Sequence, residues 1–311
     1  MAKEKKRGEG ARLSPFDMPA KAKDEEEESR APPSARRETQ ASLDSDPFRD
    51  LPDGLVYEEE PRVGVITLSR PQKLNALTFE MYRALRDIFA ALRERRHLRA
   101  VLLTGEGRGF CSGGDVDDII GELLKRDPEG LRNFTRLTCD VVANMRACPQ
   151  PIVAALNGTV AGAGAALALA SDLRIASPEA KISFLFVRAG LSGADMAAGW
   201  LLPRLVGLGR ATELLMLGDT ISAEEAQRIG LYNHVVPANK LQEVARALAN
   251  RLADGPSKGI AVTKETLDRQ LSMSLAEALE WDARVQAECM QHPDFREAYD
   301  AFVGKRKPKF T

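Results

Sequence analysis

Two glycine-rich turns are the segments of this 311-residue chain whose residue types could do chemistry. In the first, Thr104–Asp115, five glycines follow the apolar run Ala100–Leu103; the second, Asn157–Gly164, follows Pro151–Leu156. Glycine lets the backbone approach a ligand closely and take up positive φ, so free N–H groups can point at one spot. Two such turns, each offering one N–H group, predict an oxyanion hole that polarises a carbonyl group.

Both turns also have other interpretations. A tight strand-to-helix connection explains two glycines of the first turn but not five. The spacing Gly162-x-Gly164 is similar to that of a dinucleotide-binding turn, but Leu167 stands where a third small residue is needed. Gly109-x-Cys111-x-Gly113 matches a nucleophile elbow, which requires a histidine and an acid as partners.

Short apolar runs and helical spacing predict the elements that position these turns. Strands are expected where four to six apolar residues lie between turn signals. Their ranges are Val63–Leu68, Ala100–Leu103, Pro151–Leu156, Leu173–Ala176 and Ile182–Val187. Helices are expected after Thr78, which can cap them, from Val116, over residues 131–145, and at Ala165–Ala170.

The chain after Gly190 is expected to be largely helical, with capping boxes at Ser222-x-x-Glu225 and Ser274-x-x-Glu277. The order of elements predicts an α/β fold. Three regions follow from composition: a disordered charged tail at 1–48, a core domain at 49–255 and a C-terminal helical region at 256–311.

The bulk composition limits the partners. A net charge of -1 indicates no nucleic-acid partner, and no apolar run is long enough to span a membrane. Four cysteines without a C-x-x-C pair fit the reduced cytoplasm. No His, Cys or carboxylate spacing is typical of a metal site.

Six ordered motifs between about Val56 and Phe310 resemble the enoyl-CoA hydratase/isomerase (crotonase) superfamily. Three of them surround the two turns: Arg70-Pro71-x-x-x-Asn75-Ala76-Leu77, Phe110-Cys111-Ser112-Gly113-Gly114-Asp115, and Asn157-Gly158-x-x-x-Gly162-x-Gly164. The others are Leu217–Ala226, Gly230–Pro237 and Phe302–Phe310. The resemblance implies a crotonase (ClpP-like) superhelix of ββα units with a helical C-terminal trimerisation region, assembling as a homotrimer or a dimer of trimers.

The resemblance also implies the site. Gly114 and Ala163 match the positions whose N–H groups receive the thioester oxygen, and coenzyme A enters as part of an acyl-CoA substrate, with no separate cofactor. The residues implied to contact the substrate or its coenzyme A are Lys73, Leu74, Ala76, Ser112, Gly113, Asp115, Val116, Gly162, Phe186 and Lys305. In this family Lys305 would reach a phosphate of a neighbouring subunit, whereas a solvated lysine is the simpler interpretation.

The acids that hydratases of this family use are missing. Their two glutamates would fall on Ala166 and Phe186, neither of which can move a proton. Asp195 matches, with a one-residue insertion, the aspartate of dienoyl-CoA isomerases. Apolar neighbours such as Met196 and Trp200 should raise its pKa, although an Asp before Met-Ala-Ala could instead cap a helix.

The function predicted is therefore hydration or isomerisation of an enoyl-CoA through an enolate-like intermediate, with Asp195 as the proton carrier. Two alternatives stay open: thioester hydrolysis, with Asp195 positioning water, and a non-catalytic acyl-CoA-binding scaffold. The aromatic residues Phe184, Phe186 and Trp200 hint at a cyclic or aromatic acyl group.

Overall fold

The computed structural model describes residues 46–311, so the predicted tail at 1–48 lies outside the described residues except for its last three. One of these, Phe48, is buried, with its ring centroid 4.7 Å from that of Tyr57. The Arg95 guanidinium lies 4.3 Å from the same ring. The described fold therefore includes Phe48, just ahead of the predicted boundary at residue 49.

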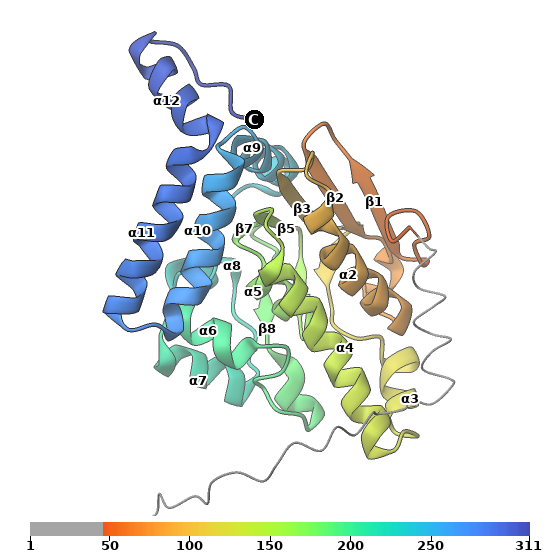
Figure 1. Cartoon of the computed structure of the whole chain (residues 1–311). Helices are drawn as coiled ribbons and strands as arrows, with labels where there is room; N and C mark the ends of the chain where they lie inside the picture. Colours follow the sequence, from red (N-terminus) through yellow and green to blue (C-terminus); the bar gives the residue numbers. More distant parts are fainter. Residues whose placement is uncertain (1–45) are drawn as a thin grey trace, which may run out of the picture. The chain divides into compact units, whose positions relative to one another are not determined.

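Residues 46–311 contain two β-sheets (Figure 1). The main sheet has the order β1-β2-β3-β5-β7-β9, with β1 antiparallel to β2 and all other neighbours parallel. Its strands are β1 (Leu55–Glu59), β2 (Val63–Leu68), β3 (Ala100–Gly105), β5 (Ile152–Leu156), β7 (Leu173–Ala176) and β9 (His234–Val235). The small parallel sheet joins β4 (Gly109–Cys111), β6 (Thr159–Ala161) and β8 (Ile182–Ser183).

Each strand of the small sheet follows directly on a strand of the main sheet, and a helix comes next. The pair β3–β4 leads to α4 (Pro128–Ala147), and β5–β6 leads to α5 (Ala163–Ala170). The pair β7–β8 leads to α6 (Ala198–Val206) by way of a short 3-10 helix. This repetition confirms the predicted ββα units of the crotonase fold.

The central strands β2, β3, β5 and β7 are buried on both faces, as their near-continuous apolar residues predict. Side chains alternate along β3, so that Val101 and Leu103 join the core formed with α2 (Phe79–Ala91) and α4. Ala100 and Leu102 point to the other face, where α9 (Leu241–Ala253) covers them. The sheet thus lies between two helical layers, and the two turns emerge on the side of α4 and α5.

Most predicted elements are confirmed, but one strand is not. Val63–Leu68 and Leu173–Ala176 are strands with the expected limits, and Thr78 caps α2 by accepting the Met81 N–H. The predicted strand Ile182–Val187 is wrong, because β8 ends at Ser183 and a 3-10 helix occupies Leu185–Ala189. Its partner β6 ends opposite Ser183, so the chain beyond has no strand to pair with.

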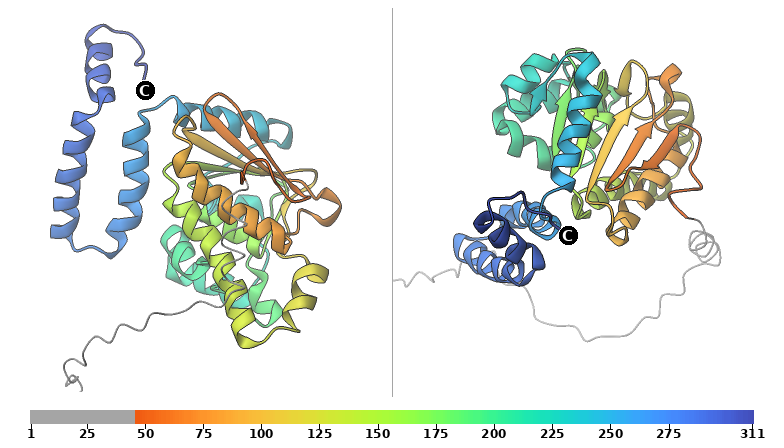
Figure 2. Two further views of the ribbon diagram at one scale, coloured as in Figure 1. Left: turned by 45° about the vertical axis from the view of Figure 1, so that its right-hand side comes forward. Right: turned by 90° about the horizontal axis from the view of Figure 1, so that it is seen from above.

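The region after Gly190 is helical, as predicted. It contains α6, α7 (Leu208–Leu217), α8 (Ala223–Arg228), α9, α10 (Ser257–Arg269), α11 (Leu275–Gln291) and α12 (Pro293–Val303). In both figures α10 and α11 lie side by side, apart from the sheets, and α12 continues beyond them (Figures 1 and 2). None of the helices within residues 46–311 is long and apolar enough to cross a membrane.

The two predicted capping boxes differ in outcome. At the start of α11, Ser274 and Glu277 exchange both hydrogen bonds, so this box is confirmed. At the start of α8, Ser222 accepts the Glu225 N–H at 3.2 Å, but the Glu225 carboxylate turns to Arg228 instead. The second box is therefore only half formed, because a bidentate ion pair one turn later competes for the carboxylate.

Candidate active site

The first glycine-rich turn is fixed by backbone bonds to the segment before α2. The Leu77 N–H donates to the Gly113 carbonyl at 2.8 Å, and the Asp115 N–H donates to the Leu77 carbonyl at 2.8 Å. Gly113 has φ 108, a conformation that favours glycine. These bonds engage the residues on both sides of Gly114, whose own N–H donates to nothing within residues 46–311.

The second turn ends at the first residue of α5. Ala163 occupies that position, so its N–H is one of the helix-terminal donors without an intrahelical partner. Gly162 before it has φ 51, and its N–H donates to the Ser183 carbonyl at 3.1 Å. The turn therefore presents the Ala163 N–H while the small sheet holds its neighbour.

The two turns contact each other. A Cβ placed on Gly113 would lie 3.7 Å from the Ala163 nitrogen, and one placed on Gly162 would lie 3.6 Å from the Gly113 Cα. The free N–H groups of Gly114 and Ala163 thus belong to adjoining backbone segments. An oxyanion hole requires two unbonded donors on neighbouring segments, so the oxyanion role of Gly114 and Ala163 stays a prediction.

A buried ion pair braces the first turn. The Asp115 carboxylate, whose residue is 3% exposed, lies 3.0 Å from the Arg70 guanidinium and caps the helix that follows by accepting the Asp117 N–H at 3.0 Å. Burial alone would raise the pKa of Asp115, but the N–H groups of Asp118 and Asp117 and the Arg70 guanidinium hold it below its usual value. Asp115 is thus fully engaged in holding the turn.

The predicted helix after the turn is confirmed, but it opens as a π-helix at Val116–Ile120 before α3 (Gly121–Leu123). Val116 is exposed next to the turn. Lys73 is also exposed and its ammonium lies 2.9 Å from the Asp117 carboxylate. Coenzyme A contacts by these two residues stay predictions.

Most of the other predicted contact residues lie in the segment before α2 or in the first turn, which is hydrogen-bonded to that segment. The Ser112 N–H donates to the Leu74 carbonyl at 3.0 Å, and the Ala76 carbonyl accepts from Arg70 at 2.7 Å. Lys305 is the exception, since it follows α12, which lies far from α3 in both figures. A contact of Lys305 with the site would therefore have to be made with another copy of the chain.

Asp195 lies in the turn before α6 and does not cap that helix. Its Oδ1 accepts the Met196 N–H at 2.8 Å, whereas the cap position of α6 is held by Ala197 without a side-chain bond. Met196 and Ala197 both take up positive φ, 48 and 62, which is unusual for residues with a side chain. Such backbone strain often occurs at functional sites, and the catalytic role of Asp195 stays a prediction.

The pKa of the Asp195 carboxyl group is raised, as its apolar neighbours in the sequence predict. Burial raises its pKa, and the Met196 N–H offsets only part of that rise. The charge of Asp195 in turn adds to the raised pKa of Cys139 on α4, whose main cause is burial. A carboxyl group with a raised pKa is suited to receive and return a proton near neutral pH.

Tyr82 is a further buried group near both Cys111 and Asp195, and no pattern in the sequence marks it as a site residue. Its side chain is 3% exposed, and its ring meets that of Phe134 edge-on at 5.7 Å. Burial, then the nearby Cys111 and then Asp195 raise the pKa of the Tyr82 hydroxyl far above its usual value. The hydroxyl of Tyr82 is therefore neutral at ordinary pH.

Three of the remaining candidates are packed into the core, and the substrate contact of Phe186 stays a prediction. Ala166 is fully buried in α5, and Phe186 is half-buried against the core. Burial raises the pKa of the Cys111 thiol to about 12, so Cys111 is no nucleophile and the elbow interpretation is wrong. Trp200 stacks with Arg204, 4.1 Å from its guanidinium, and lines a cavity beside α10. The hint of an aromatic pocket that included Trp200 is not supported.

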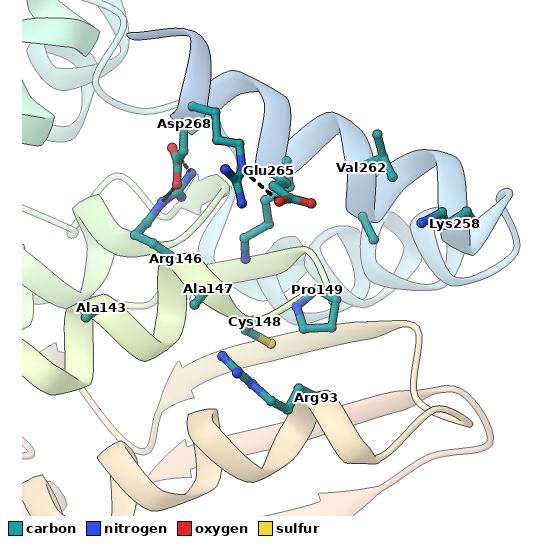
Figure 3. Close-up of a pocket in the computed structure, with 13 residues that line it drawn as sticks. Arg93, Ala143, Arg146, Ala147, Cys148, Pro149, Lys258, Val262, Glu265 and Asp268 are labelled. Atoms are coloured by element: carbon teal, nitrogen blue, oxygen red, sulfur yellow. Dashed lines mark hydrogen bonds and ion pairs between the residues drawn. The ribbon is translucent and has the colours of Figure 1, made fainter. Parts of the chain in front are cut away.

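A separate cavity of about 790 Å3 lies between the end of α4 and α10 (Figure 3). Two basic residues of its lining are paired with acids: Arg146 lies 2.8 Å from Asp268 and 2.9 Å from Asp172, and the buried Lys264 lies 2.8 Å from Asp172. None of the predicted site residues lines it. The ion pairs beside the cavity hold α10 against the core.

The sequence matches the family model for enoyl-CoA hydratase/isomerase over residues 58–311. The chain belongs to the enoyl-CoA hydratase/isomerase family. It is 42% identical over 256 residues to a protein of Rhodobacter capsulatus named probable enoyl-CoA hydratase, covering 82% of this chain and 96% of that one. It is 35% identical over 252 residues to the 1,2-epoxyphenylacetyl-CoA isomerase of Escherichia coli, covering 81% and 96%.

Solved structures of enoyl-CoA hydratase/isomerase relatives agree. A protein of Streptomyces coelicolor A3(2), provisionally assigned as an enoyl-CoA hydratase, superposes with a TM-score of 0.83 at 53% identity. That match covers 86% of this chain and 97% of the other. The enoyl-CoA hydratase of Bacillus anthracis gives a TM-score of 0.78 at 30% identity, covering 83% and 99%. The fold of this family member is thus shared almost over the full length of its relatives.

Proposed function

We propose that this enzyme converts an enoyl-CoA through a thioester enolate, by isomerisation or by hydration. The observation that carries the proposal is that two turns in contact with each other each contain one unbonded backbone N–H group, that of Gly114 and that of Ala163. Donors fixed in this way stabilise the negative charge that develops on a thioester oxygen, and each contributes about 3 kcal/mol to lowering the barrier.

Asp195 is the proton carrier in this proposal. In isomerisation its carboxylate takes a proton from one carbon of the acyl group, the charge moves to the thioester oxygen, and the same carboxyl group returns the proton to another carbon. The double bond shifts and nothing is gained or lost. One acid suffices for this sequence, so a single carboxyl group with a raised pKa favours isomerisation.

Hydration also uses Asp195 for both of its proton transfers, but it requires a bound water as well. The carboxylate would take a proton from water as the oxygen attacks the β-carbon, and then return it to the α-carbon of the enolate. Without acids at Ala166 and Phe186, no second carboxyl group holds the water. Hydration is therefore expected to be the slower of the two reactions.

The assembly we propose is a homotrimer or a dimer of trimers in the reduced cytoplasm. Supporting it, the C-terminal helices expose large apolar side chains, among them Tyr299, Phe302 (85% exposed) and Val303. Apolar patches of this kind mark protein interfaces, and a second copy would cover them. A neighbouring copy would also bring its Lys305 within reach of bound coenzyme A.

A panel of acyl-CoA esters with product mass analysis tests the reaction, with crotonyl-CoA as the first substrate. A product of unchanged mass with a moved double bond supports isomerisation, and a gain of one water supports hydration. Free coenzyme A thiol would point to hydrolysis instead. Tight binding without any product would identify a scaffold and overturn the proposal.

A further inference from the structure

The two donor turns share one carbonyl group. Asn75 donates its side-chain N–H to the Gly109 carbonyl at 2.7 Å, and Asn157 donates to the same oxygen at 3.0 Å. Asn75 lies in the segment whose Leu77 is hydrogen-bonded to the residues on both sides of Gly114. Asn157 is the first residue of the second turn. Gly109 begins β4, the strand that runs into the first turn.

Asn75 uses both its amide nitrogen and its amide oxygen in this arrangement. Asn75 is 0% exposed, donates also to the Glu106 carbonyl at 3.0 Å, and accepts the Arg70 N–H at 2.8 Å. Its φ of 57 is tolerated better by asparagine and aspartate than by other side chains.

Asn157 donates also to the Gly107 carbonyl at 2.8 Å, while its own Oδ1 is buried without a partner. An unpaired buried acceptor costs free energy, and the two hydrogen bonds from the amide nitrogen hold Asn157 in place against that cost.

The two turns are also packed backbone to backbone at this place. A Cβ on Gly158 would lie 2.0 Å from the Arg108 carbonyl oxygen, so the second turn has no freedom to move toward β4. The amides oppose movement in the other direction, because separation of the turns would break their bonds to Gly109.

We infer that Asn75 and Asn157 are positioning residues, which act through the Gly109 carbonyl to hold the Gly114 and Ala163 N–H groups at one separation. The inference rests on the proposed oxyanion hole. A displacement of about 1 Å in such a site can cost about a hundredfold in rate, so the amides matter although neither touches the substrate.

Asn75→Asp and Asn157→Asp test this with little other change. Aspartate tolerates the φ of residue 75 and keeps the acceptor for Arg70, but in each variant a carboxylate oxygen replaces the donor and repels the Gly109 carbonyl. The probe is [1-13C]butyryl-CoA, a saturated thioester that binds without turnover, and the readout is the infrared carbonyl stretch of the bound probe.

We expect the wild type to lower this stretching frequency on binding, and each variant to lose at least half of that shift. The kcat should fall about 10- to 100-fold with KM changed much less. Gln150→Glu is the matched control, because Gln150 is also buried and donates to the Leu92, Arg95 and Leu98 carbonyls, away from both turns. It should lower stability but leave the carbonyl shift intact.

The outcomes separate this inference from the proposed function. If the wild type shows no carbonyl shift, the oxyanion hole itself is wrong. If the wild type shifts and a folded Asn157→Asp protein shifts equally, the positioning role is wrong. Asn157 is only half-buried, so this variant keeps the test available should Asn75→Asp fail to fold.

Discussion

Gly164 and Cys111 are packed so closely that a Cβ on Gly164 would lie 2.3 Å from the Cys111 carbonyl oxygen and 2.7 Å from the Cys111 Cβ. This contact joins α5 to β4, and so fastens the element that ends one donor turn to the strand that begins the other. The closeness sets the distance between the two proposed donors.

Gly164→Ala should therefore destabilise the protein by about 1–3 kcal/mol, the usual cost of overpacking, and lower kcat by displacing Ala163. Urea unfolding and steady-state kinetics measure the two effects. Gly121→Ala is the control, since a Cβ on Gly121 meets nothing within 4 Å. Equal stability of the two variants would contradict the packing argument.

Gly114 can be tested with one substitution that keeps its N–H group and one that removes it. Gly114→Ala keeps the N–H, and its Cβ would meet Ile119 at an ordinary 3.7 Å, so kcat should stay within about threefold of the wild type. Gly114→Pro removes the N–H and should lower kcat by about 100- to 1,000-fold. Circular dichroism establishes that both variants are folded; a folded, fully active proline variant would remove Gly114 from the mechanism.

Asp195→Asn should lower kcat by about 100- to 10,000-fold while acyl-CoA binding, measured by calorimetry, is kept. Asp140→Asn is a suitable control, because Asp140 is a second carboxylate that acts on Cys139 but lies outside the proposed chemistry. Full activity of Asp195→Asn would assign the proton transfer elsewhere.

The pH dependence follows from the raised pKa of Asp195. As a base it must be ionised, so kcat/KM should fall as the pH drops through its pKa, and this acidic limb should lie above about 3.9, the value of an ordinary aspartate. Tyr82→Phe removes the nearby neutral hydroxyl and should move the limb further upward. A limb unchanged in Tyr82→Phe would show that the hydroxyl does not act on Asp195.

Asp115, unlike Asp195, has a lowered pKa, and we expect this shift to make the stability of the fold depend on pH. Its pKa is lowered in the folded protein, so its ion pair with Arg70 stabilises the fold above the unfolded pKa of about 3.9 and is lost as the pH falls through the folded value. Asp115→Asn should cost about 1–3 kcal/mol at pH 7, and the difference from wild type should shrink in acid. Urea midpoints at pH 7 and pH 3 compare the two; a difference that stays constant would refute the ion-pair explanation.

The sequence predicted the parts of this fold that depend on neighbours along the chain. Glycine density in the first turn and helical spacing after Thr78 were sufficient for the turn and for α2. The Arg70–Asp115 ion pair and the shared Gly109 acceptor join residues far apart in sequence, so local patterns could not reveal them. Tyr82 was missed because it lies among the apolar residues of α2 and is buried with them.

The wrong strand at Ile182–Val187 has a similar cause. Its apolar residues have strand propensity, but strands form only where a partner edge exists, and β6 offers one only as far as Ser183. The raised pKa of Asp195 could be predicted from its apolar neighbours in the sequence, whereas the strained backbone of Met196 and Ala197 next to it could not.

Both proposed oxyanion donors belong to the main chain, which has a consequence for how such an enzyme can change over generations. No exchange of a side chain at position 114 or 163 removes an N–H group, except one to proline. Substitutions at 166, 186 or 195 can therefore add, move or delete a proton carrier without removing either N–H group. A change from one reaction to another would leave the two proposed donors in place.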